Sequence, residues 1–391
     1  MQFSYNNQVL TLYLTGRLDA VSAPAAETEI GEILEKNPAD TIILDCDGME
    51  YCSSAGLRVI LRLKQKVDGT SLVNVHPVLY EILDTTGFTE MMEVKKAFRL
   101  LSLDGCELIG QGANGRIFRM DSEHIMKVYT NTDSLAEIDH ERELSRAAFV
   151  LGVPTAIPYD VVKVREGGYG SIYELLNAKT YAQLLTDGEK TPDELVRMSI
   201  DLLKLIHSRI VKQAVIPSIR ETALGWALYL KDWLPPERFE KLYALIEAVP
   251  EDMHMVHGDF HFRNIMYQDG ESLLIDMDKL SHGHPVFELA AMYNTLLGYG
   301  LADHTVLEQY LGIPMKTAGE IWHKSLELYL DTQDEQILRS VEEKAMVVGH
   351  ARLMRHYLRR NGMETEEGRR HIETSRRVLD KLLPRTDTLV F

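Results

Sequence analysis

The sequence predicts an α/β domain over residues 1–98, followed by a larger α+β region whose C-terminal part is mostly helical. Two observations predict this order. Short apolar runs typical of strands alternate with helix-like segments through residues 8–95, which is the pattern of an α/β sheet. From residue 287 to residue 383, apolar residues recur at helical spacing almost without interruption.

The first domain begins with residues 8–14, where apolar and polar side chains alternate as in a half-buried strand. We expect the chain to turn at residues 16–19 and to form a helix over residues 20–35. Residues 41–44 are apolar, as in a parallel strand that is buried on both faces. The alternation continues with a turn at 51–57, a helix ending near Val67, a strand at 71–75 and a helix from Pro77 to Gly87.

Two short segments carry a resemblance to a known family. With Gly16-Arg17-Leu18-Asp19 early and Tyr51-Cys52-Ser53-Ser54-Ala55-Gly56-Leu57 before a helix, the domain resembles the STAS (sulfate transporter and anti-sigma factor antagonist) domain. The resemblance implies that Ser54 is the phosphoacceptor and that this domain regulates or binds a protein partner. A helix N-terminus also stabilises added negative charge. The alternative is that Ser53 or Ser54 only caps the helix; many family members have Asp where this chain has Ser53.

Residues 91–102 join the two parts of the chain. The segment is not rich in Pro, Gly or Ser, so we expect a short, semi-rigid connection rather than a flexible linker.

A glycine-rich stretch opens the second part, with Gly110, Gly112 and Gly115 around Ala113-Asn114. In a dinucleotide-binding fold a helix would follow directly, but residues 116–120 alternate as a strand and residues 125–128 form a second one. A glycine hairpin followed by a strand lysine is the arrangement that kinases use around phosphates. Lys127 is therefore expected to contact the nucleotide phosphates, the alternative being an exposed strand lysine.

The segment that organises the second part is His257-Gly258-Asp259-Phe260-His261-Phe262-Arg263-Asn264, followed by Ile275-Asp276-Met277-Asp278. Asp259 is placed to orient and deprotonate an acceptor hydroxyl. Asn264 and Asp276 supply the oxygen ligands that Mg²⁺ prefers. The alternative is an acidic turn that only caps neighbouring elements.

These motifs resemble the catalytic loop of the aminoglycoside phosphotransferase and choline-kinase-like family, which has a bilobal protein-kinase-like fold. The resemblance covers residues 102–391 and implies a nucleotide lobe over 102–178 and a lobe with the catalytic loop, metal and acceptor pocket over 179–391. It also implies a hinge at residues 172–176, where backbone groups of Glu174 and Leu175 would hold the purine.

A helix over residues 134–150 should hold the carboxylate that orients Lys127. Glu141 is our choice, from its distance to Gly152-Val153-Pro154, which follows this helix in the resembled family. Glu137 and Glu143 remain alternatives.

Several residues near the catalytic loop are expected to support it. We expect His257 to brace the loop backbone and Glu288 to buttress it, while Asp278 is a second metal ligand or lies just behind the metal. Arg263 either neutralises the transferring phosphate or faces solvent. An Arg-rich tail is interspersed with glutamates and is expected to be a solvated helix face; its arginines are Arg352, Arg355, Arg359, Arg360, Arg369, Arg370, Arg376 and Arg377.

The bulk composition narrows the function classes. The chain is 45% hydrophobic and 26% charged, with a net charge of −17. Such a charge argues against binding to nucleic acid or to an anionic membrane surface. Cys46, Cys52 and Cys106 lack metal-ligand or redox spacing, and there is no signal segment or long apolar stretch. We therefore expect a cytoplasmic protein.

The leading hypothesis is a Mg²⁺- and ATP-dependent kinase of a small hydroxyl-bearing molecule, with GTP left open as the donor. The second is a protein kinase that phosphorylates Ser54 or a partner's STAS serine; against it, the loop reads His-Gly-Asp where protein kinases have His-Arg-Asp. The third is a non-catalytic nucleotide sensor. Amino-alcohols, aminoglycosides, sugars and nucleosides all remain open as acceptors.

Overall fold

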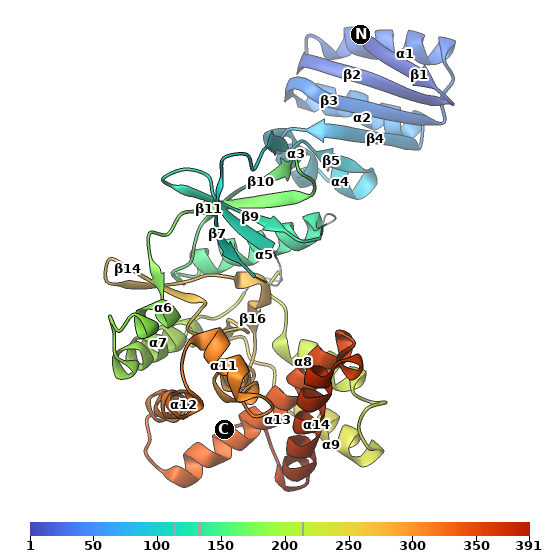
Figure 1. The fold of residues 1–391 in the computed structure, drawn as a ribbon. Coiled ribbons are helices and arrows are strands. Elements are labelled where there is room, and N and C mark those ends of the chain that lie inside the picture. Colours follow the sequence, from blue (N-terminus) through green and yellow to red (C-terminus); the bar gives the residue numbers. More distant parts are fainter. Residues whose placement is uncertain (113–114, 132–133, 213–214) are drawn as a thin grey trace. The chain divides into compact units, whose positions relative to one another are not determined.

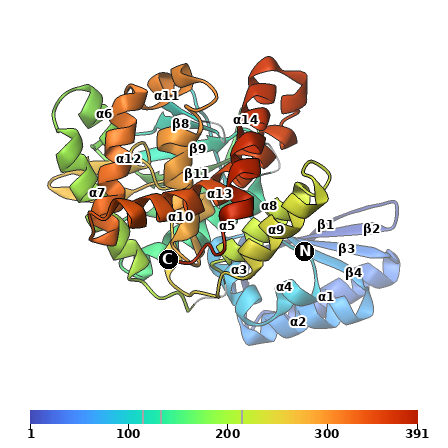
Figure 2. The same cartoon turned by 90° about the horizontal axis from the view of Figure 1, so that it is seen from below.

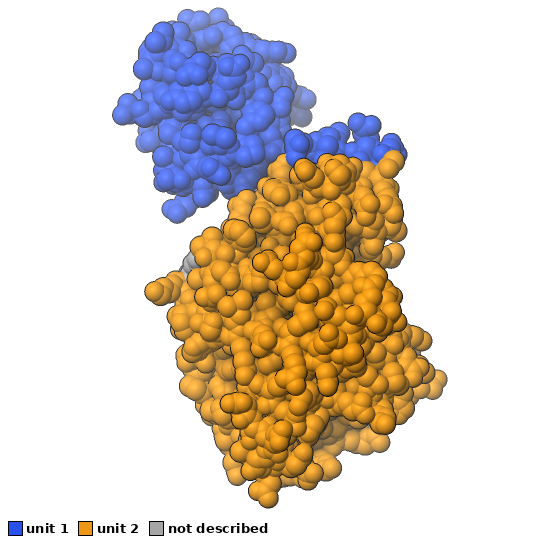
Figure 3. All heavy atoms as spheres, turned by 90° about the vertical axis from the view of Figure 1, so that its left-hand side faces the viewer, with its two compact units in different colours: residues 1–104, 161–168 blue, residues 105–160, 169–391 orange. Residues whose placement is uncertain are grey.

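The computed structural model describes the whole chain except residues 113–114, 132–133 and 213–214. The chain folds as two compact units, residues 1–104 with 161–168 and residues 105–160 with 169–391, coloured blue and orange in Figure 3. The short strand β6 (Arg99–Leu101) pairs in parallel with the second half of β10 (Pro158–Val164). This pairing explains why residues 161–168 group with the first unit.

The first unit contains a five-stranded sheet in the order β1-β2-β3-β4-β5 (Figure 1). The first pair is antiparallel and the other pairs are parallel. The strands are β1 (Gln2–Asn6), β2 (Val9–Leu18), β3 (Thr41–Cys52), β4 (Gly69–Val75) and β5 (Val94–Lys96). The helices are α1 (Ala23–Lys36), α2 (Ser54–Lys66), α3 (Pro77–Thr85) and α4 (Phe88–Met91).

Alternation along β2 buries Leu10, Leu12 and Leu14, as the sequence predicts. The expected turn at residues 16–19 is wrong, because β2 runs on to Leu18. Irregular register with β3 and a positive φ of 67° at Gly16 accommodate the bend inside the strand. The strand expected at residues 41–44 likewise continues to Cys52, since Cys46 and Met49 remain buried beyond its apolar start.

Helix α2 begins where the sequence predicts. The Ser53 hydroxyl caps it by accepting the Ala55 N–H at 3.2 Å, and Ser54 is its first residue and is exposed. Gly56 lies so close to β2 that a Cβ there would come within 2.4 Å of the Leu18 carbonyl oxygen. A glycine is therefore required for this helix to pack on its strand.

The connecting segment is more regular than expected. Residues 91–102 include the short strands β5 and β6, each of which pairs with a longer neighbour. Their pairing partners are distant in sequence, which is why local composition did not reveal them.

The second unit opens with an antiparallel run of strands in the order β7-β8-β9-β11, together with helix α5 (Leu135–Val150). The strands are β7 (Glu107–Gln111), β8 (Gly115–Arg119), β9 (His124–Tyr129) and β11 (Tyr169–Glu174). Within this run Ile117 pairs with Lys127, and Lys127 pairs with Ser171. Lys127 thus sits on the central strand β9.

The remainder of the second unit is mostly helical (Figures 1 and 2). Its helices are α6 (Tyr181–Thr186), α7 (Pro192–His207), α8 (Ile219–Tyr229), α9 (Pro236–Glu247), α10 (Val286–Tyr293), the π-helix η2 (Asn294–Gly298), α11 (His304–Leu311), α12 (Met315–Leu330), α13 (Glu335–Arg359) and α14 (Glu366–Leu382), with short 3₁₀ turns η1 (Met277–Lys279), η3 (Gly362–Glu364) and η4 (Leu383–Arg385). Its short strands are β12 (Lys179–Thr180), β13 (Met255–Val256), β14 (Ile265–Gln268), β15 (Glu271–Leu274) and β16 (Ser281–His282). The helical pattern predicted from residue 287 to residue 383 is confirmed.

Two apolar cores hold these helices together. One includes Ile206, Phe260 and Leu289, and the other includes Trp226, Phe287 and Met354. Helix α10 contributes to both cores, so the residues next to it are held from two sides. Within the described ranges, no helix is both long and apolar enough to cross a bilayer.

Candidate active site

One buried carboxylate holds the loop between β13 and β14. Glu288, fully buried on α10, accepts the backbone N–H groups of His257, Gly258 (3.0 Å) and Phe260 (3.4 Å). Burial by itself would raise the pKa of Glu288, but the neighbouring imidazoles of His207 and His257 and the Gly258 amide hold it below its usual value. Glu288 therefore buttresses the loop as an anion, the structural position that the sequence indicated.

The two histidines beside Glu288 hold the loop in place. The His257 Nδ1 accepts the Asp259 N–H at 3.3 Å, and its Nε2 lies 3.3 Å from the Ile275 carbonyl oxygen. His207, on α7, contacts the Tyr329 hydroxyl at 2.7 Å. Gly258 has a φ of 79°, and a Cβ there would meet the Lys279 carbonyl oxygen at 2.5 Å. Only glycine fits this turn.

Asp259 lies at the surface end of the loop, with 36% of its side chain exposed. Its carboxylate lies 3.6 Å from His261 Nε2 and 3.5 Å from Arg352 Nη2. Burial by itself raises the pKa of Asp259, but the nearby His261, Arg352 and His257 outweigh it and keep the pKa well below the usual range. An ionised carboxylate is thus presented to solvent.

Arg352 corrects the expectation that the whole Arg-rich tail is a solvated face. Its side chain, on α13, is only 23% exposed. It donates to the Gly258 carbonyl oxygen at 2.7 Å as well as approaching Asp259. The residue is 93 positions from Asp259 in the chain, so local sequence carried no signal for the contact.

A β-hairpin brings Asn264 and Asp276 together. Strands β14 and β15 pair antiparallel with Ile265 opposite Leu274, and the Ile275 N–H donates to the Asn264 carbonyl at 3.0 Å. Asn264 precedes one strand and Asp276 follows the other, so the two residues sit at the same end of the hairpin. The Asn264 side-chain nitrogen donates to the Asp259 carbonyl oxygen at 3.0 Å. The side-chain oxygen of Asn264 takes no part in this bond.

Lys127 connects the strand lobe to this hairpin. Its ammonium group lies 2.7 Å from Glu141 and 3.0 Å from Asp276. The hydroxyls of Tyr129 (2.8 Å) and Tyr173 (3.3 Å) also contact the Glu141 carboxylate. Burial alone lowers the pKa of Lys127, but Glu141 and Asp276 raise it above its usual value. Of the three glutamates considered on α5, Glu141 is buried against Lys127, while Glu137 and Glu143 are exposed.

The donor set at the hairpin fits a magnesium ion. Burial and the charge of Asp276 raise the pKa of Asp278, as expected for a carboxyl group with a second carboxylate nearby. Mg²⁺ binds through one or two carboxylates and retains places for water and phosphate oxygens. Among the described residues no group of three His, Cys, Asp or Glu side chains is arranged to hold a metal ion by itself. An ion at Asn264, Asp276 and Asp278 would therefore depend on nucleotide phosphates as well.

The glycine hairpin is described in part, because Ala113 and Asn114 lie outside the described residues. The Gly112 N–H donates to the Gly115 carbonyl at 2.9 Å. At Gly115 a Cβ would come within 2.3 Å of the Val128 carbonyl oxygen, so glycine is needed there for packing on β9. Gly110 is in β7 and packs against Ile117.

The purine contact at the hinge stays a prediction, and the structure limits which backbone groups could make it. The Leu175 N–H donates to the Glu123 carbonyl at 2.7 Å, and the Glu174 N–H approaches the Ile157 carbonyl at 3.3 Å. These amides extend the strand hydrogen bonds, so neither N–H is free to bind a base in this structure. A backbone donor for the purine has to come from another residue of the segment, whereas the carbonyls of Glu174 and Leu175 are not constrained by these bonds.

Arg263 lies against α11. Its guanidinium carbon is 4.5 Å from the centre of the Tyr310 ring, and the Tyr310 hydroxyl lies 3.1 Å from His261 Nε2. Arg263 therefore packs against Tyr310, which contacts His261 next to Asp259, rather than against Lys127.

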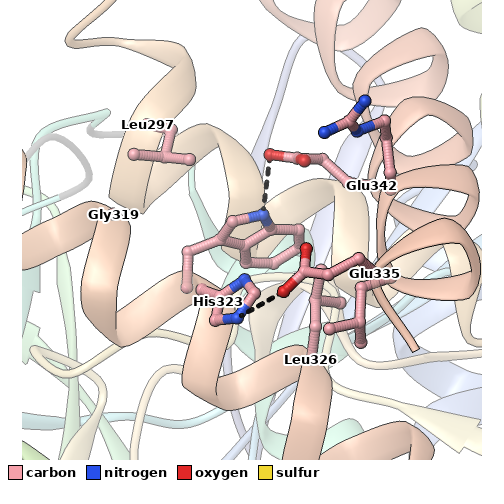
Figure 4. Close-up of a pocket in the computed structure, with 9 residues that line it drawn as sticks. Leu297, Gly319, His323, Leu326, Glu335 and Glu342 are labelled. Carbon is pink, nitrogen blue, oxygen red and sulfur yellow. Dashed lines mark hydrogen bonds and ion pairs between the residues drawn. The ribbon is translucent and has the colours of Figure 1, made fainter. Parts of the chain in front are cut away.

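A separate cavity of about 260 Å³ lies between α12, α13 and η2 (Figure 4). In it the Trp322 indole donates to Glu342 at 3.1 Å, and His323 Nε2 lies 3.5 Å from Glu335. None of the predicted site residues lines this cavity.

Comparison with known proteins identifies both parts of the chain. The family model described as the phosphotransferase enzyme family matches residues 105–314, more than half of the chain. The chain belongs to this family. The STAS domain model matches residues 2–100, so the phosphotransferase carries an N-terminal STAS domain.

Individual relatives agree with this division. An anti-sigma F factor antagonist of Paenibacillus polymyxa is 24% identical over 98 residues, covering 24% of this chain and 84% of that protein. The anti-sigma-F factor antagonist RsfB of Mycobacterium tuberculosis is 31% identical over 62 residues, 16% of this chain and 50% of that protein. Both matches concern only the STAS part of the phosphotransferase.

Solved structures resemble the phosphotransferase part in fold. The crystal structure of aminoglycoside phosphotransferase APH(4)-Ia superimposes with a TM-score of 0.52 at 13% identity, covering 71% of this chain and 93% of that one. A thermostable mutant of that enzyme, in a ternary complex with AMP-PNP and hygromycin B, gives a TM-score of 0.51 at 13% identity with the same coverage. These likenesses support a kinase-like fold with a helical C-terminal lobe for the phosphotransferase part, and the STAS match covers the α/β part, so the predicted fold class is confirmed.

Proposed function

We propose that the chain transfers the terminal phosphoryl group of Mg·ATP or Mg·GTP to a hydroxyl group of a small molecule. The observation that carries the proposal is Lys127, which lies within 3.0 Å of both Glu141 and Asp276. One ammonium group thus joins the nucleotide strands to the hairpin that holds Asn264 and Asp276. In this assignment residues 102–178 bind the nucleotide, while residues 179–391 carry the catalytic loop and the acceptor pocket.

Each group then has a defined task. Lys127 binds the α- and β-phosphates while Glu141 fixes its position, and Asn264 and Asp276 hold the metal ion. When bound, the ion neutralises charge on the phosphate oxygens. Asp259 orients the acceptor hydroxyl and receives its proton as the new oxygen–phosphorus bond forms and the bond to the leaving diphosphate breaks. The lowered pKa of Asp259 makes its carboxylate a weak base. We therefore expect the proton to move from the acceptor hydroxyl to Asp259 late in the transfer, as suits a loose transition state.

Two measurements test this function. Isothermal titration calorimetry with ATP and GTP, with and without Mg²⁺, should show nucleotide binding that depends on the metal. A screen of a metabolite pool with γ-labelled ATP should then transfer label to a small hydroxyl compound. Binding without any transfer would instead support a nucleotide sensor, and the absence of binding to both Mg·nucleotides would refute the proposal.

A second role is proposed for the STAS domain. Ser54 is exposed at the first turn of α2, where helix dipole and free amides favour a phosphate, and Ser53 rather than Ser54 provides the cap. We infer that the domain binds a protein partner and that phosphorylation of Ser54 controls this binding. Incubation with Mg·ATP followed by mass spectrometry tests self-phosphorylation. A mass gain on Ser54 that disappears in Ser54→Ala supports a protein-kinase activity, and an unmodified Ser54 argues against it.

A further inference from the structure

Three arginines lie along one face of helix α13, beginning beside Asp259, and a fourth follows at the end of the helix. Arg352, Arg355 and Arg359 are spaced at i, i+3 and i+7, which places them on a common side of the helix, and Arg360 is its C-cap residue. We call them the α13 basic strip. The chain as a whole carries a net charge of −17, so a strip of one positive sign beside Asp259 runs against its overall charge.

Aromatic rings of α8 fix the first two members of the strip. The guanidinium of Arg352 lies 5.5 Å from the centre of the Trp226 ring, and that of Arg355 lies 5.8 Å from the Tyr229 ring. A guanidinium that lies over an aromatic ring loses conformational freedom, while its N–H groups remain available to bind an oxyanion. Because Arg352 also contacts Asp259 and Gly258, the strip starts at the proposed base and follows the helix axis away from it.

Only Arg352, which lies 3.5 Å from Asp259, pairs with a carboxylate among the strip residues in the described structure. Within the part of the chain that the structure describes, no ion pair joins Arg355, Arg359 or Arg360 to an Asp or Glu, and the buried Arg355 Nε has no hydrogen-bond partner. Arg360 instead donates to His356 Nε2 at 2.8 Å. Burial is the largest cause that lowers the pKa of His356 to about 4, and the positive charges of Arg360, Arg352 and Arg355 lower it further.

The acidic residue at the start of α11 is already paired. Asp303, which precedes α11, lies 3.3 Å from Arg370 of α14. Beside Asp259 stand His261, Tyr310 and Arg263, none of which is negatively charged at neutral pH. Apart from the proposed base and metal ligands, the surroundings of Asp259 therefore favour an anion over a cation.

We propose that the acceptor carries an anionic group, a carboxylate or a phosphate, which binds Arg355 and Arg359 while its hydroxyl meets Asp259. A rise of about 1.5 Å per residue puts Arg355 and Arg359 roughly 5 and 10 Å along the helix from Arg352. A hydroxy acid or sugar phosphate spans this distance, whereas a polycationic aminoglycoside or choline would be repelled. The inference rests on the proposed phosphotransferase function and narrows its substrate class.

The test compares four acceptors on the full-length protein with Mg·ATP. Gluconate and glucose 6-phosphate represent the two anionic sources, and choline and kanamycin represent cationic alcohols. We expect transfer to at least one anionic compound, and the anion that is used separates the carboxylate from the phosphate source.

Arg355→Gln should raise KM for that compound about 10- to 100-fold, the usual scale for a lost charge-assisted hydrogen bond, with Arg355→Lys intermediate. Arg377→Gln, on the exposed face of α14, is the matched control and should leave KM unchanged.

Direct binding separates failure of this inference from failure of the proposed function. Calorimetry with gluconate and glucose 6-phosphate in the presence of Mg·ADP should show binding that Arg355→Gln weakens, with thermal melting used to confirm that the variant is folded. Anion binding of this kind without transfer to any acceptor would overturn the proposed function but support the anion site. Preferential transfer to choline or kanamycin, or a KM that Arg355→Gln does not change, would overturn the inference.

Discussion

Replacing Asp259 by alanine is expected to lower the rate of phosphoryl transfer by about 10²- to 10⁴-fold, the usual contribution of a general base. The side chain is 36% exposed and is held ionised by His261 and Arg352, so it can reach an acceptor hydroxyl. Affinity for Mg·nucleotide should persist, because Lys127 is held by Glu141 and Asp276 and contacts neither oxygen of Asp259.

Steady-state transfer assays and calorimetry on the same preparation check this expectation. Asp232→Ala removes an exposed carboxylate from the turn after α8 and serves as the control, with activity and binding both retained. Wild-type turnover in Asp259→Ala would remove Asp259 from the mechanism. Loss of nucleotide binding together with turnover would show that the residue supports the site rather than the chemistry.

Replacing Glu288 by alanine is expected to lower the free energy of unfolding by about 3–5 kcal/mol, the scale for breaking a buried charge network, and to inactivate the enzyme. The change leaves the amides of His257, Gly258 and Phe260 without their acceptor inside the core. Glu288→Asp keeps the charge but shortens the side chain by one methylene group, so a smaller loss is expected. Denaturant unfolding followed by circular dichroism measures both variants.

The pKa of Glu288 adds a pH dependence to the same experiment. Its folded-state pKa is lowered from the ordinary value of 4.5, so its contribution is complete above pH 4.5 and is lost as pH falls toward the folded value. The difference in unfolding free energy between wild type and Glu288→Gln should therefore be constant between pH 6 and 8 and shrink on acidification below about pH 4.5. A difference that is constant down to the acid-unfolding region would contradict this assignment.

Much of the candidate site could be predicted because its members are close in sequence or joined by local structure. Asp259 and Asn264 share one loop, and a single hairpin returns Asp276 to them. Glu141 follows from its distance to Gly152-Val153-Pro154, a segment of the resembled family, and the buried side of α5 holds it against Lys127. Glycine positions were equally local, since Gly258 needs a positive φ and Gly115 a close approach to β9.

The misses arose where a distant partner decides a residue's environment. Strand β2 passes through the expected turn because β3 pairs along its whole length, and Arg352 contacts Asp259, which is 93 positions away in the chain. Neither partner can be inferred from the residues next to the segment.

By itself, the sequence determined the order of the two domains, the loop that carries Asp259 and the strand lysine Lys127, because these depend on motifs and spacing along the chain. Only the tertiary structure decided that Arg352 belongs to the site and that the α13 basic strip begins there. The arginines look alike in the sequence, whereas packing of α13 against α8 and the catalytic loop buries one of them beside Asp259 and leaves others in solvent. The charge that the acceptor meets is therefore set by how the helices assemble.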